Sequence, residues 1–266
     1  MLELVQAIPP GSRVLDLGAG PGSFQTERSD LLIVRVDLAV RSTRVPGAWV
    51  SADAAHLPFA SNTFDLVISN HSLEHFPELD RTLSEIGRVV KPGAVLYVAV
   101  PDASTLTDRI YRWLARGGGH VNPFRSPDEV TRLVEDRTGL PHRATRVLFT
   151  SLSFLNAHNF VAPPPRRIIL FARGNENFLA TFTWLLRALD RRFGSRLSQY
   201  GWSFYFGNVD LPRSLEPWIN VCVRCGSGFS EAWLRKTGAV GPIPGAFDRY
   251  LCPRCGGRNR FTRVNL

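Results

Sequence analysis

One stretch near the start of the chain, Val14 to Gly22, constrains the fold more than any other. Its sequence, V-L-D-L-G-A-G-P-G, leads from apolar residues and an acid into three glycines at alternate positions. Such a run suits a buried parallel strand, and such glycines suit a tight turn whose backbone comes close to a ligand. A strand that ends in this turn and feeds a helix is the nucleotide-binding corner of a doubly wound α/β sheet. The spacing D-x-G-x-G-x-G differs, however, from the G-x-G-x-x-G of dinucleotide sites.

Apolar runs alternate with helical patterns along the first 150 residues, which predicts an α/β fold. Strands are expected at 13–17, 31–37, 48–52, 66–69 and 94–100, with helices near 22–29 and over 79–90. Later helices are expected at 105–115, 126–138 and 178–193, and later strands at 143–150 and 200–207. The wide apolar face of 178–193 has two interpretations. We favour a helix packed on the sheet over a lid, spanning 154–196, that covers an apolar substrate or meets a membrane surface.

The glycine turn and the segments after it, up to about residue 101, resemble the class I S-adenosylmethionine (SAM) dependent methyltransferases with a type 11-like domain. The resemblance implies a Rossmann-like, doubly wound and mostly parallel sheet of seven strands. It also implies that residues 200–207 close this sheet as an antiparallel edge. The cofactor expected from the resemblance is SAM, and the expected chemistry is displacement at its sulfonium methyl group.

Ten residues are predicted to bind SAM: Asp16, Gly18, Ala19, Gly20, Gly22, Asp37, Leu38, Asp53, Ala54 and Asn70. The glycines let the backbone approach the amino acid moiety, and Asp16 shapes the turn. Asp37 follows Asp16 by 21 residues, close to the interval at which a carboxylate meets a ribose, and a carboxylate accepts both hydroxyls of a cis-diol. The resemblance places Asp53 at the adenine amino group. The structural alternatives are a solvent-facing strand end for Asp37 and a loop or helix cap for Asp53.

Histidines follow the fourth expected strand, at the sheet edge where ligands bind in open α/β folds. His71 and His75 are four residues apart with Glu74 between them, a spacing that suggests a metal site. We favour a helical turn whose polar groups orient the cofactor or cap the helix. A general base is optional in this chemistry, and the candidates are His71, His75 and His120, the last in the loop that begins at Gly117.

All four cysteines lie in the last 45 residues as two C-x-x-C pairs, Cys222 with Cys225 and Cys252 with Cys255. Each pair is followed by a glycine, and 26 residues separate the pairs. Four thiolates in this pattern make a closed tetrahedral Zn²⁺ site, which is structural and not catalytic. The tail therefore resembles a zinc ribbon that needs the metal for much of its stability.

The expected organisation is a methyltransferase domain at 1–216 and a zinc-ribbon-like domain at 217–266, joined by a linker near 211–217. The formal net charge of +9 is uneven: residues 1–150 carry −1, residues 151–217 carry +4 and residues 218–266 carry +6. A basic tail indicates either an anionic partner such as nucleic acid or a solvated surface in an arginine-rich chain.

The predicted function is methyl transfer to oxygen or nitrogen of a small-molecule, lipid or sugar acceptor. The sequence has no N/D-P-P-Y/F after the fourth strand and no cysteine in residues 1–221, which counts against adenine-amino and pyrimidine-C5 methylation of nucleic acid. The alternatives are an RNA methyltransferase that grips RNA with its basic ribbon, and a non-catalytic binding module with the SAM fold. With no run of 18 apolar residues and no secretory signal in Met1 to Pro10, a cytoplasmic protein is expected; the oligomeric state is left open.

Overall fold

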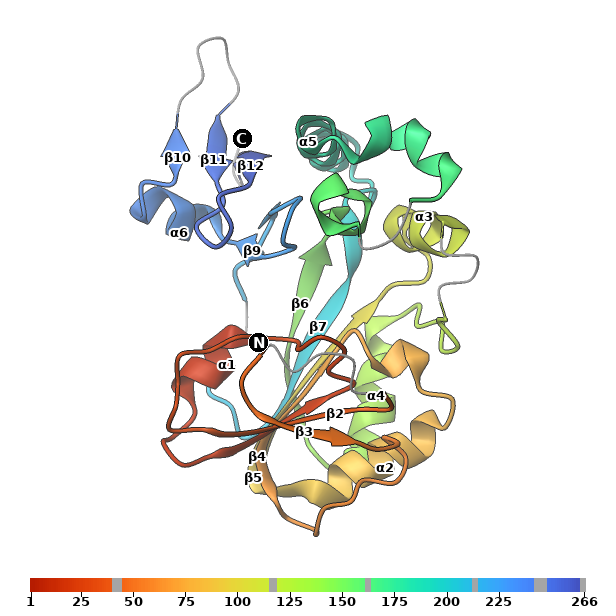
Figure 1. Cartoon of the computed structure of the whole chain (residues 1–266), viewed down its shortest axis with the longest axis vertical. Coiled ribbons are helices and arrows are strands. Elements are labelled where there is room, and N and C mark those ends of the chain that lie inside the picture. The colour runs from red at the N-terminus through yellow and green to blue at the C-terminus, as the bar shows by residue number, and fades with distance from the viewer. Residues whose placement is uncertain (40–44, 115–118, 161–163, 212–214, 242–247, 264–266) are drawn as a thin grey trace. The chain divides into compact units, whose positions relative to one another are not determined.

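The computed structural model describes residues 1–39, 45–114, 119–160, 164–211, 215–241 and 248–263, and its main feature is a seven-stranded sheet (Figure 1). The strands are β1 (Arg13–Leu17), β2 (Leu32–Asp37), β3 (Ala48–Ser51), β4 (Phe64–Asn70), β5 (Val90–Pro101), β6 (His142–Phe149) and β7 (Gln199–Gly207). Their order across the sheet is β3-β2-β1-β4-β5-β7-β6. The pairs β1–β2, β1–β4, β2–β3 and β4–β5 are parallel. The expected α/β fold with a mostly parallel sheet is confirmed.

Strand β7 runs antiparallel to both of its neighbours. At its end, the N–H of Gly207 donates to Pro141 O, just before β6, and the N–H of Asn208 donates to Ala94 O in β5. The expectation that residues 200–207 form an edge strand is wrong, because β7 lies between β5 and β6. Its last seven residues are all buried, which suits a strand that pairs on both sides.

The helix expected near 22–29 is absent, and this part of the chain is turn and irregular structure. Two backbone groups of the segment bond elsewhere: the N–H of Ser23 donates to Asp16, and the carbonyl of Phe24 accepts from Arg35. Phe24 is itself 1% exposed. Because these buried groups are engaged with the strands β1 and β2, the segment packs as an ordered loop and not as a helix.

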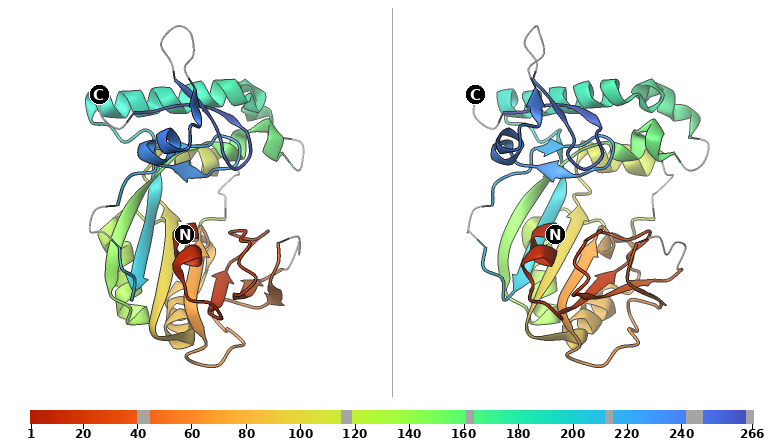
Figure 2. Two further views of the ribbon diagram at one scale, coloured as in Figure 1. Left: turned by 90° about the vertical axis from the view of Figure 1, so that its left-hand side faces the viewer. Right: turned by 60° about the vertical axis from the view of Figure 1, so that its left-hand side comes forward.

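Helices cover both faces of the sheet. The helices α2 (Leu79–Val89) and α4 (Pro127–Thr138) lie side by side on one face (Figure 1). They approach closely at Gly87, where a Cβ would lie 2.9 Å from Thr138 Cα. The short helix α1 (Leu2–Ala7) lies on the other face (Figure 2) and is tied to the sheet through Glu3, which accepts from Tyr205 Oη at 2.6 Å and from Arg146 Nη1 at 3.0 Å.

The chain divides into two compact units. The first contains Met1–Asp102, Gly119–Arg146 and Trp202–Leu215, and the second contains Ala103–Gly118, Val147–Gly201 and Glu216–Leu266. The cysteine tail thus shares a unit with the segment that follows β6. The division at residue 216 stays a prediction, and so does the lid at 154–196. Residues 117–118 of the expected glycine loop, 161–163 of that lid and 212–214 of the expected linker lie outside the described residues.

The second unit contains α3 (Leu106–Leu114), the 3-10 turns η2 (Ser153–Leu155), η3 (Ala157–Asn159) and η4 (Arg166–Gly174), α5 (Glu176–Phe193) and the tail. The tail contains β8 (Asn220–Val221), β9 (Gly228–Phe229), α6 (Glu231–Lys236), β10 (Val240–Gly241), β11 (Arg249–Leu251) and β12 (Arg258–Arg260). Figure 2 shows α5 beside the tail, and α5 contacts β12. Val223 of the tail shares an apolar cluster with Leu155 and Leu179. None of the helices in the described part of the chain has the length and apolar character that crossing a membrane requires.

Candidate active site and metal centre

The glycine turn follows β1 and adopts backbone angles that favour glycine. Gly18 has φ +67° and Gly20 has φ +52°. The turn is held to β2 by two hydrogen bonds, from Ala19 N to Val36 O at 2.9 Å and from Gly20 N to Asp37 Oδ2 at 2.8 Å. The turn is therefore a fixed element, supported by the next strand of the sheet.

The two glycines have different surroundings. A Cβ at Gly18 would lie 2.4 Å from Ser72 Cβ, whereas a Cβ at Gly20 would meet none of the described atoms within 4 Å. Gly18 is therefore needed for packing between the turn and the loop after β4. Gly20 leaves open space above the turn, where a ligand could contact the backbone.

We predict that Gly18→Ala destabilises the fold and that Gly20→Ala mainly weakens cofactor binding. At Gly18, an alanine in the left-handed backbone conformation costs about 1–2 kcal/mol, and its methyl group also clashes with Ser72. Together these lower the free energy of unfolding by about 2–4 kcal/mol. At Gly20 only the strain applies, but the new methyl group would stand in the open space. Urea unfolding and SAM calorimetry of both variants check this. Equal stabilities for the two variants would contradict the role assigned to Ser72.

Asp16 is fully buried at the end of β1 and forms an ion pair with the fully buried Arg35 of β2. Its Oδ2 also accepts from Ser23 N at 3.0 Å. Burial raises the pKa of Asp16, and the hydrogen bonds from Ser23 and Arg35 counteract this only in part. Asp16 Oδ1 is buried and has no hydrogen-bond partner among the described residues. The predicted role of Asp16 in shaping the turn agrees with these contacts, although its part in binding SAM stays a prediction.

Arg35 is a site residue that the sequence analysis missed. Its guanidinium lies 4.7 Å from the centre of the Phe24 ring, and its Nη2 and Nε donate to Phe24 O at 3.0 Å and to Pro46 O at 3.2 Å. It thereby connects β1, β2 and the loop that follows each of these strands. The available signal was a single arginine within the apolar run Leu31 to Val36, since an isolated charge in a buried strand requires a partner.

Asp37 ends β2 beside the glycine turn. Its Oδ2 accepts from Gly20 N at 2.8 Å, and its Oδ1 accepts from Ala39 N at 3.3 Å. Because a carboxylate offers about four acceptor positions, both oxygens can still accept from a ligand. Leu38, the next residue, is 70% exposed and places an apolar side chain at the same edge of the sheet.

Asp53 and Ala54 follow β3. Asp53 is 52% exposed, and its Oδ1 accepts from Ala55 N at 2.9 Å, so it caps the turn that it begins. His56 Nδ1 lies 3.7 Å from Asp53 Oδ2. Ala54 is buried. The capping role given as the structural alternative is thus present, and a contact from Asp53 to the adenine stays a prediction.

The loop after β4 carries Asn70 and His71. Asn70, at the end of β4, is partly exposed, and the N–H of His71 donates to Ala99 O of β5 at 2.9 Å. His71 has φ +56°, an unusual backbone angle for a residue with a side chain. Burial lowers the pKa of His71 to about 4, with smaller contributions from His120 and His75. Its imidazole is therefore neutral at pH 7.

Ser72 is a second residue that the sequence analysis did not select. Its hydroxyl donates to Leu17 O at 3.0 Å and lies 2.6 Å from Ser69 Oγ. It is 3% exposed. Ser72 thus joins the loop after β4 to the end of β1, next to Gly18. A serine after a buried strand gives no clear sequence signal for this role.

His75 and His120 lie close together although 45 positions separate them in the sequence. Their ring centroids are 4.9 Å apart, and His75 Nδ1 lies 2.9 Å from Gly119 O. One ligand atom from each of Glu74, His75 and His120 can be chosen so that all three lie within 4.8 Å of one another. His71 Nδ1 lies 3.9 Å from Glu74 Oε1. The three candidate bases therefore come from one region at the carboxyl end of β4.

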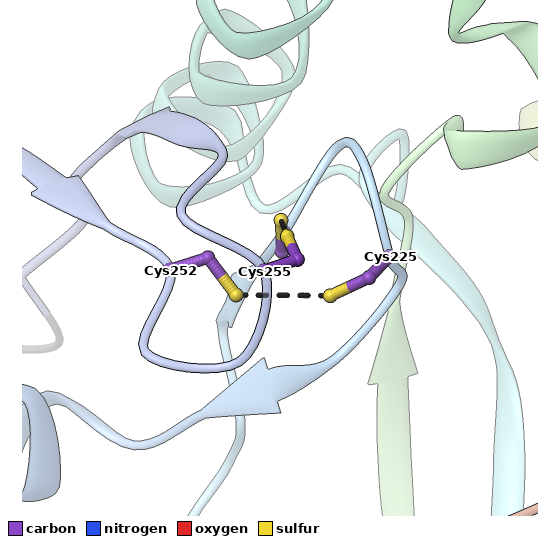
Figure 3. Close-up of side chains that lie close together, drawn as sticks. Cys225, Cys252 and Cys255 are labelled. Atoms are coloured by element: carbon purple, nitrogen blue, oxygen red, sulfur yellow. Dashed lines mark hydrogen bonds between the residues drawn. The ribbon is translucent and has the colours of Figure 1, made fainter. Parts of the chain in front are cut away.

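The four cysteines form the second candidate site, in the tail. The sulfur atoms of Cys225 and Cys252 point toward one another (Figure 3) and are 3.7 Å apart, and the Sγ atoms of Cys222 and Cys255 are 3.6 Å apart. A tetrahedral zinc with Zn–S bonds of 2.3 Å places its sulfurs about 3.8 Å apart. All four sulfurs lie within 4.8 Å of one another, and none is in a disulfide. The arrangement fits a four-thiolate metal site.

Both cysteine pairs have the same local backbone. Gly226 N donates to Cys222 O at 2.9 Å, and Gly256 N donates to Cys252 O at 2.8 Å. Hydrogen bonds from Cys222 and then Cys252 lower the pKa of the Cys225 thiol. Asn259 Nδ2 lies 3.5 Å from Cys222 Sγ and supplies a donor for a thiolate. The two Cys-x-x-Cys turns expected from the sequence are therefore present in the tail, and their binding of a metal stays a prediction.

Comparison with known proteins identifies relatives of the first part of the chain. A model of the methyltransferase domain family matches residues 15–98. Malonyl-[acyl-carrier protein] O-methyltransferase of Methylococcus capsulatus is 33% identical over 193 residues, covering 60% of this chain and 68% of that protein. Demethylmenaquinone methyltransferase of Corynebacterium kroppenstedtii is 40% identical over 151 residues, covering 51% of this chain and 64% of that protein. The chain thus spans about two thirds of the length of each.

Solved structures share the fold at lower identity. A sarcosine dimethylglycine methyltransferase candidate from Galdieria sulphuraria is 18% identical with a TM-score of 0.51, covering 79% of this chain and 83% of that one. A methyltransferase candidate from an antibiotic biosynthesis pathway of Anabaena variabilis is 19% identical with a TM-score of 0.50, covering 78% and 97%. At these identities the likeness concerns the fold alone.

Proposed function

The chain belongs to the methyltransferase domain family and is a SAM-dependent methyltransferase, and from this premise we propose that it methylates oxygen or nitrogen of a small-molecule, lipid or sugar acceptor. The open space over Gly20 and the hydrogen bond from Gly20 N to Asp37 support the cofactor site, and the observation that carries the acceptor class is what the similar proteins are named for. The two relatives are named for a carrier-bound malonyl group and for demethylmenaquinone, neither of which is a nucleic acid.

The residues at this edge of the sheet fit SAM. The Asp37 carboxylate, held by Gly20 N and Ala39 N, offers acceptors for the two ribose hydroxyls. The exposed Leu38 beside it offers an apolar surface for a base. Asp16 has one buried oxygen without a partner among the described residues. We assign the cofactor to these residues, together with Gly18, Ala19, Gly22, Asp53, Ala54 and Asn70.

The protein contributes to the reaction mainly by positioning the acceptor relative to the methyl group of SAM. When bound, SAM supplies a methyl group that its sulfonium already activates for displacement. The rigid turn, fixed by Ala19, Asp37 and the Asp16–Arg35 pair, holds the site in one geometry. Alignment of a nucleophile with its target can supply about 7–11 kcal/mol of a barrier. His71, His75 and His120 are the groups we assign to receive a proton from an acceptor.

We predict that Asp37→Ala weakens SAM binding by about 1–3 kcal/mol, the cost of losing a charged hydrogen-bond acceptor. The variant also removes the acceptor for Gly20 N, which loosens the turn. Calorimetry measures the affinity. Asp30→Ala is the matched control, because Asp30 precedes β2 at its opposite end and pairs with Arg28. An Asp37 variant with the affinity of the unaltered protein would remove Asp37 from the site.

For the tail we propose a structural Zn²⁺ held by Cys222, Cys225, Cys252 and Cys255. A site with four protein thiolates has no open position for a substrate. The metal would order a tail whose own apolar cluster has, among the described residues, Leu234, Tyr250 and Phe261 as its buried members.

Transfer of a labelled methyl group from SAM to fractionated cell extract tests the proposed acceptor. We expect label in the lipid or small-molecule fraction. Label in the RNA fraction would support the second candidate, which rests on the basic tail: Arg249, Arg254 and Arg258 are exposed there. RNA binding would then weaken steeply with added salt. If the purified protein does not bind SAM at all, a non-catalytic binding module is the better interpretation.

A further inference from the structure

We propose that Glu74, His75 and His120 bind a divalent transition-metal ion, a second metal site separate from the four cysteines. The carboxylate and the two imidazoles each offer a ligand atom, and these atoms lie within 4.8 Å of one another. Two histidines and one carboxylate are the ligands of many sites that keep open positions for a substrate or water. The sequence spacing suggested His71 with His75. In the structure His71 Nδ1 lies 3.9 Å from Glu74 Oε1, and the fold adds His120 to the group.

The first support for the site is the orientation of His75. Its Nδ1 lies 2.9 Å from Gly119 O, a distance at which the ring N–H donates to the carbonyl. With the proton on Nδ1, Nε2 has its lone pair available for a metal. Histidine ligands in metal sites are commonly held in this way by a backbone carbonyl.

The second support is the rigid connection between the two segments that supply the ligands. Val121 N and Asn122 N donate to Glu74 O at 2.8 and 3.1 Å. Asn122 Nδ2 donates to Leu73 O and Phe76 O, both at 2.8 Å. The segment that carries His120 is therefore fastened to the turn that carries Glu74 and His75. Such pre-organisation reduces the cost of collecting three ligands.

The third support is burial. Glu74 is 1% exposed, so its carboxylate lies on the buried side of the group. His75 is exposed and His120 is partly exposed, so the site is open to solvent on the histidine side. A cation bound there would keep a face toward an incoming ligand.

The position of the site next to the glycine turn indicates a role for the metal in binding the acceptor. Phe76, next to His75, packs against the glycine turn: its Cζ would lie 3.1 Å from a Cβ at Gly18. The metal would thus lie near the corner where SAM is assigned. Resting on the proposed function, we assign its open position to an oxygen of the acceptor. With His75 and His120 bound to the metal, neither would accept the proton, so the hydroxyl would lose it to solvent. Its oxygen would form the bond to the methyl carbon, and the S–CH₃ bond would break with its electron pair left on sulfur.

Cobalt binding to the whole chain of 266 residues, with zinc in the cysteine site, tests the proposal. Co²⁺ bound by nitrogen and oxygen gives weak visible bands, whereas thiolate-bound Co²⁺ gives strong charge-transfer absorption. We expect one equivalent of Co²⁺ to bind without the thiolate signal. His120→Ala and Glu74→Gln should each weaken binding at least about tenfold, since even outer-shell changes have effects of that size.

His158→Ala is the matched control, because His158 is an exposed histidine 3.8 Å from the carboxylate of Glu176 in the second unit. Its Co²⁺ affinity should equal that of the unaltered protein. SAM calorimetry on each variant shows whether it is folded. If Glu74→Gln loses SAM binding, it is not used, and the Co²⁺ affinities of His120→Ala and His75→Gln test the metal site. The site is refuted if the unaltered protein takes up no Co²⁺, or if folded variants bind it undiminished. Metal binding without SAM binding would instead refute the proposed function.

Discussion

Removal of zinc from the four-cysteine site should unfold the tail while leaving the affinity for SAM unchanged. Structural zinc contributes about 10–16 kcal/mol in small zinc-dependent domains, which is more than the small apolar cluster of Leu234, Tyr250 and Phe261 would replace. The residues assigned to SAM all lie in the first compact unit, whereas the cysteines lie in the second. We therefore expect the effect of the metal to stay within the second unit.

The second unit should change beyond the tail itself. Glu176 of α5 accepts from Arg224 Nε at 2.7 Å and from Arg258 N at 2.8 Å, and Asn156 Nδ2 donates to Val223 O at 2.9 Å. Loss of these contacts would uncover the apolar residues that Val223 covers, among them Leu155 and Leu179. We expect early proteolytic cleavage in the tail, followed by cleavage in 147–201.

Chelation followed by limited proteolysis and SAM calorimetry measures both effects. Readdition of zinc should restore protection to the unaltered protein but not to Cys225→Ser, which lacks one ligand. Should chelation abolish SAM binding as well, the division of the chain into a cofactor-binding part and a metal-stabilised tail would be wrong.

Arg35→Met should lower the free energy of unfolding by about 3–5 kcal/mol, the usual result of removing one partner of a buried ion pair. Asp16 would remain in a position with 0% exposure without its cation, and the carbonyls of Phe24 and Pro46 would each lose a donor. Methionine keeps much of the side-chain volume, so the loss reports the charge and the hydrogen bonds more than a cavity. Because Asp16 also holds Ser23 N, SAM affinity should fall too.

Urea unfolding of Arg35→Met, Asp16→Asn and the double variant measures the interaction energy between the two charges apart from the other contacts of each residue. The double variant should be more stable than the sum of the single changes predicts, since neither charge is then buried alone. Arg137→Met is the control: its ion pair with Asp80 is exposed, with 48% and 68% of the two side chains accessible, so its loss should amount to less than about 1 kcal/mol. Equal losses for Arg35 and Arg137 would contradict the role given to burial.

Much of the fold could be predicted from local patterns in the sequence. Arg13–Leu17 was predicted as a strand with the observed bounds, and the alternation of apolar runs indicated a parallel sheet. The helix expected at 22–29 failed because Asp16 and Arg35 engage the backbone of Ser23 and Phe24. Asp16 and Arg35 belong to two separate strands and lie outside the segment 22–29, so the helical pattern of that segment does not show the competition.

The sequence by itself determined the features that depend on neighbouring residues: the glycine turn after β1, the family that the turn indicates, and the two C-x-x-C pairs of the tail. Only the tertiary structure decided which distant groups meet. It paired Asp16 with Arg35, set β7 between β5 and β6, and brought His120 to Glu74 and His75. The physical reason is that backbone angles and metal-ligand spacing are local properties, whereas buried charges and ligand clusters are completed by contacts that depend on how all the strands and loops pack.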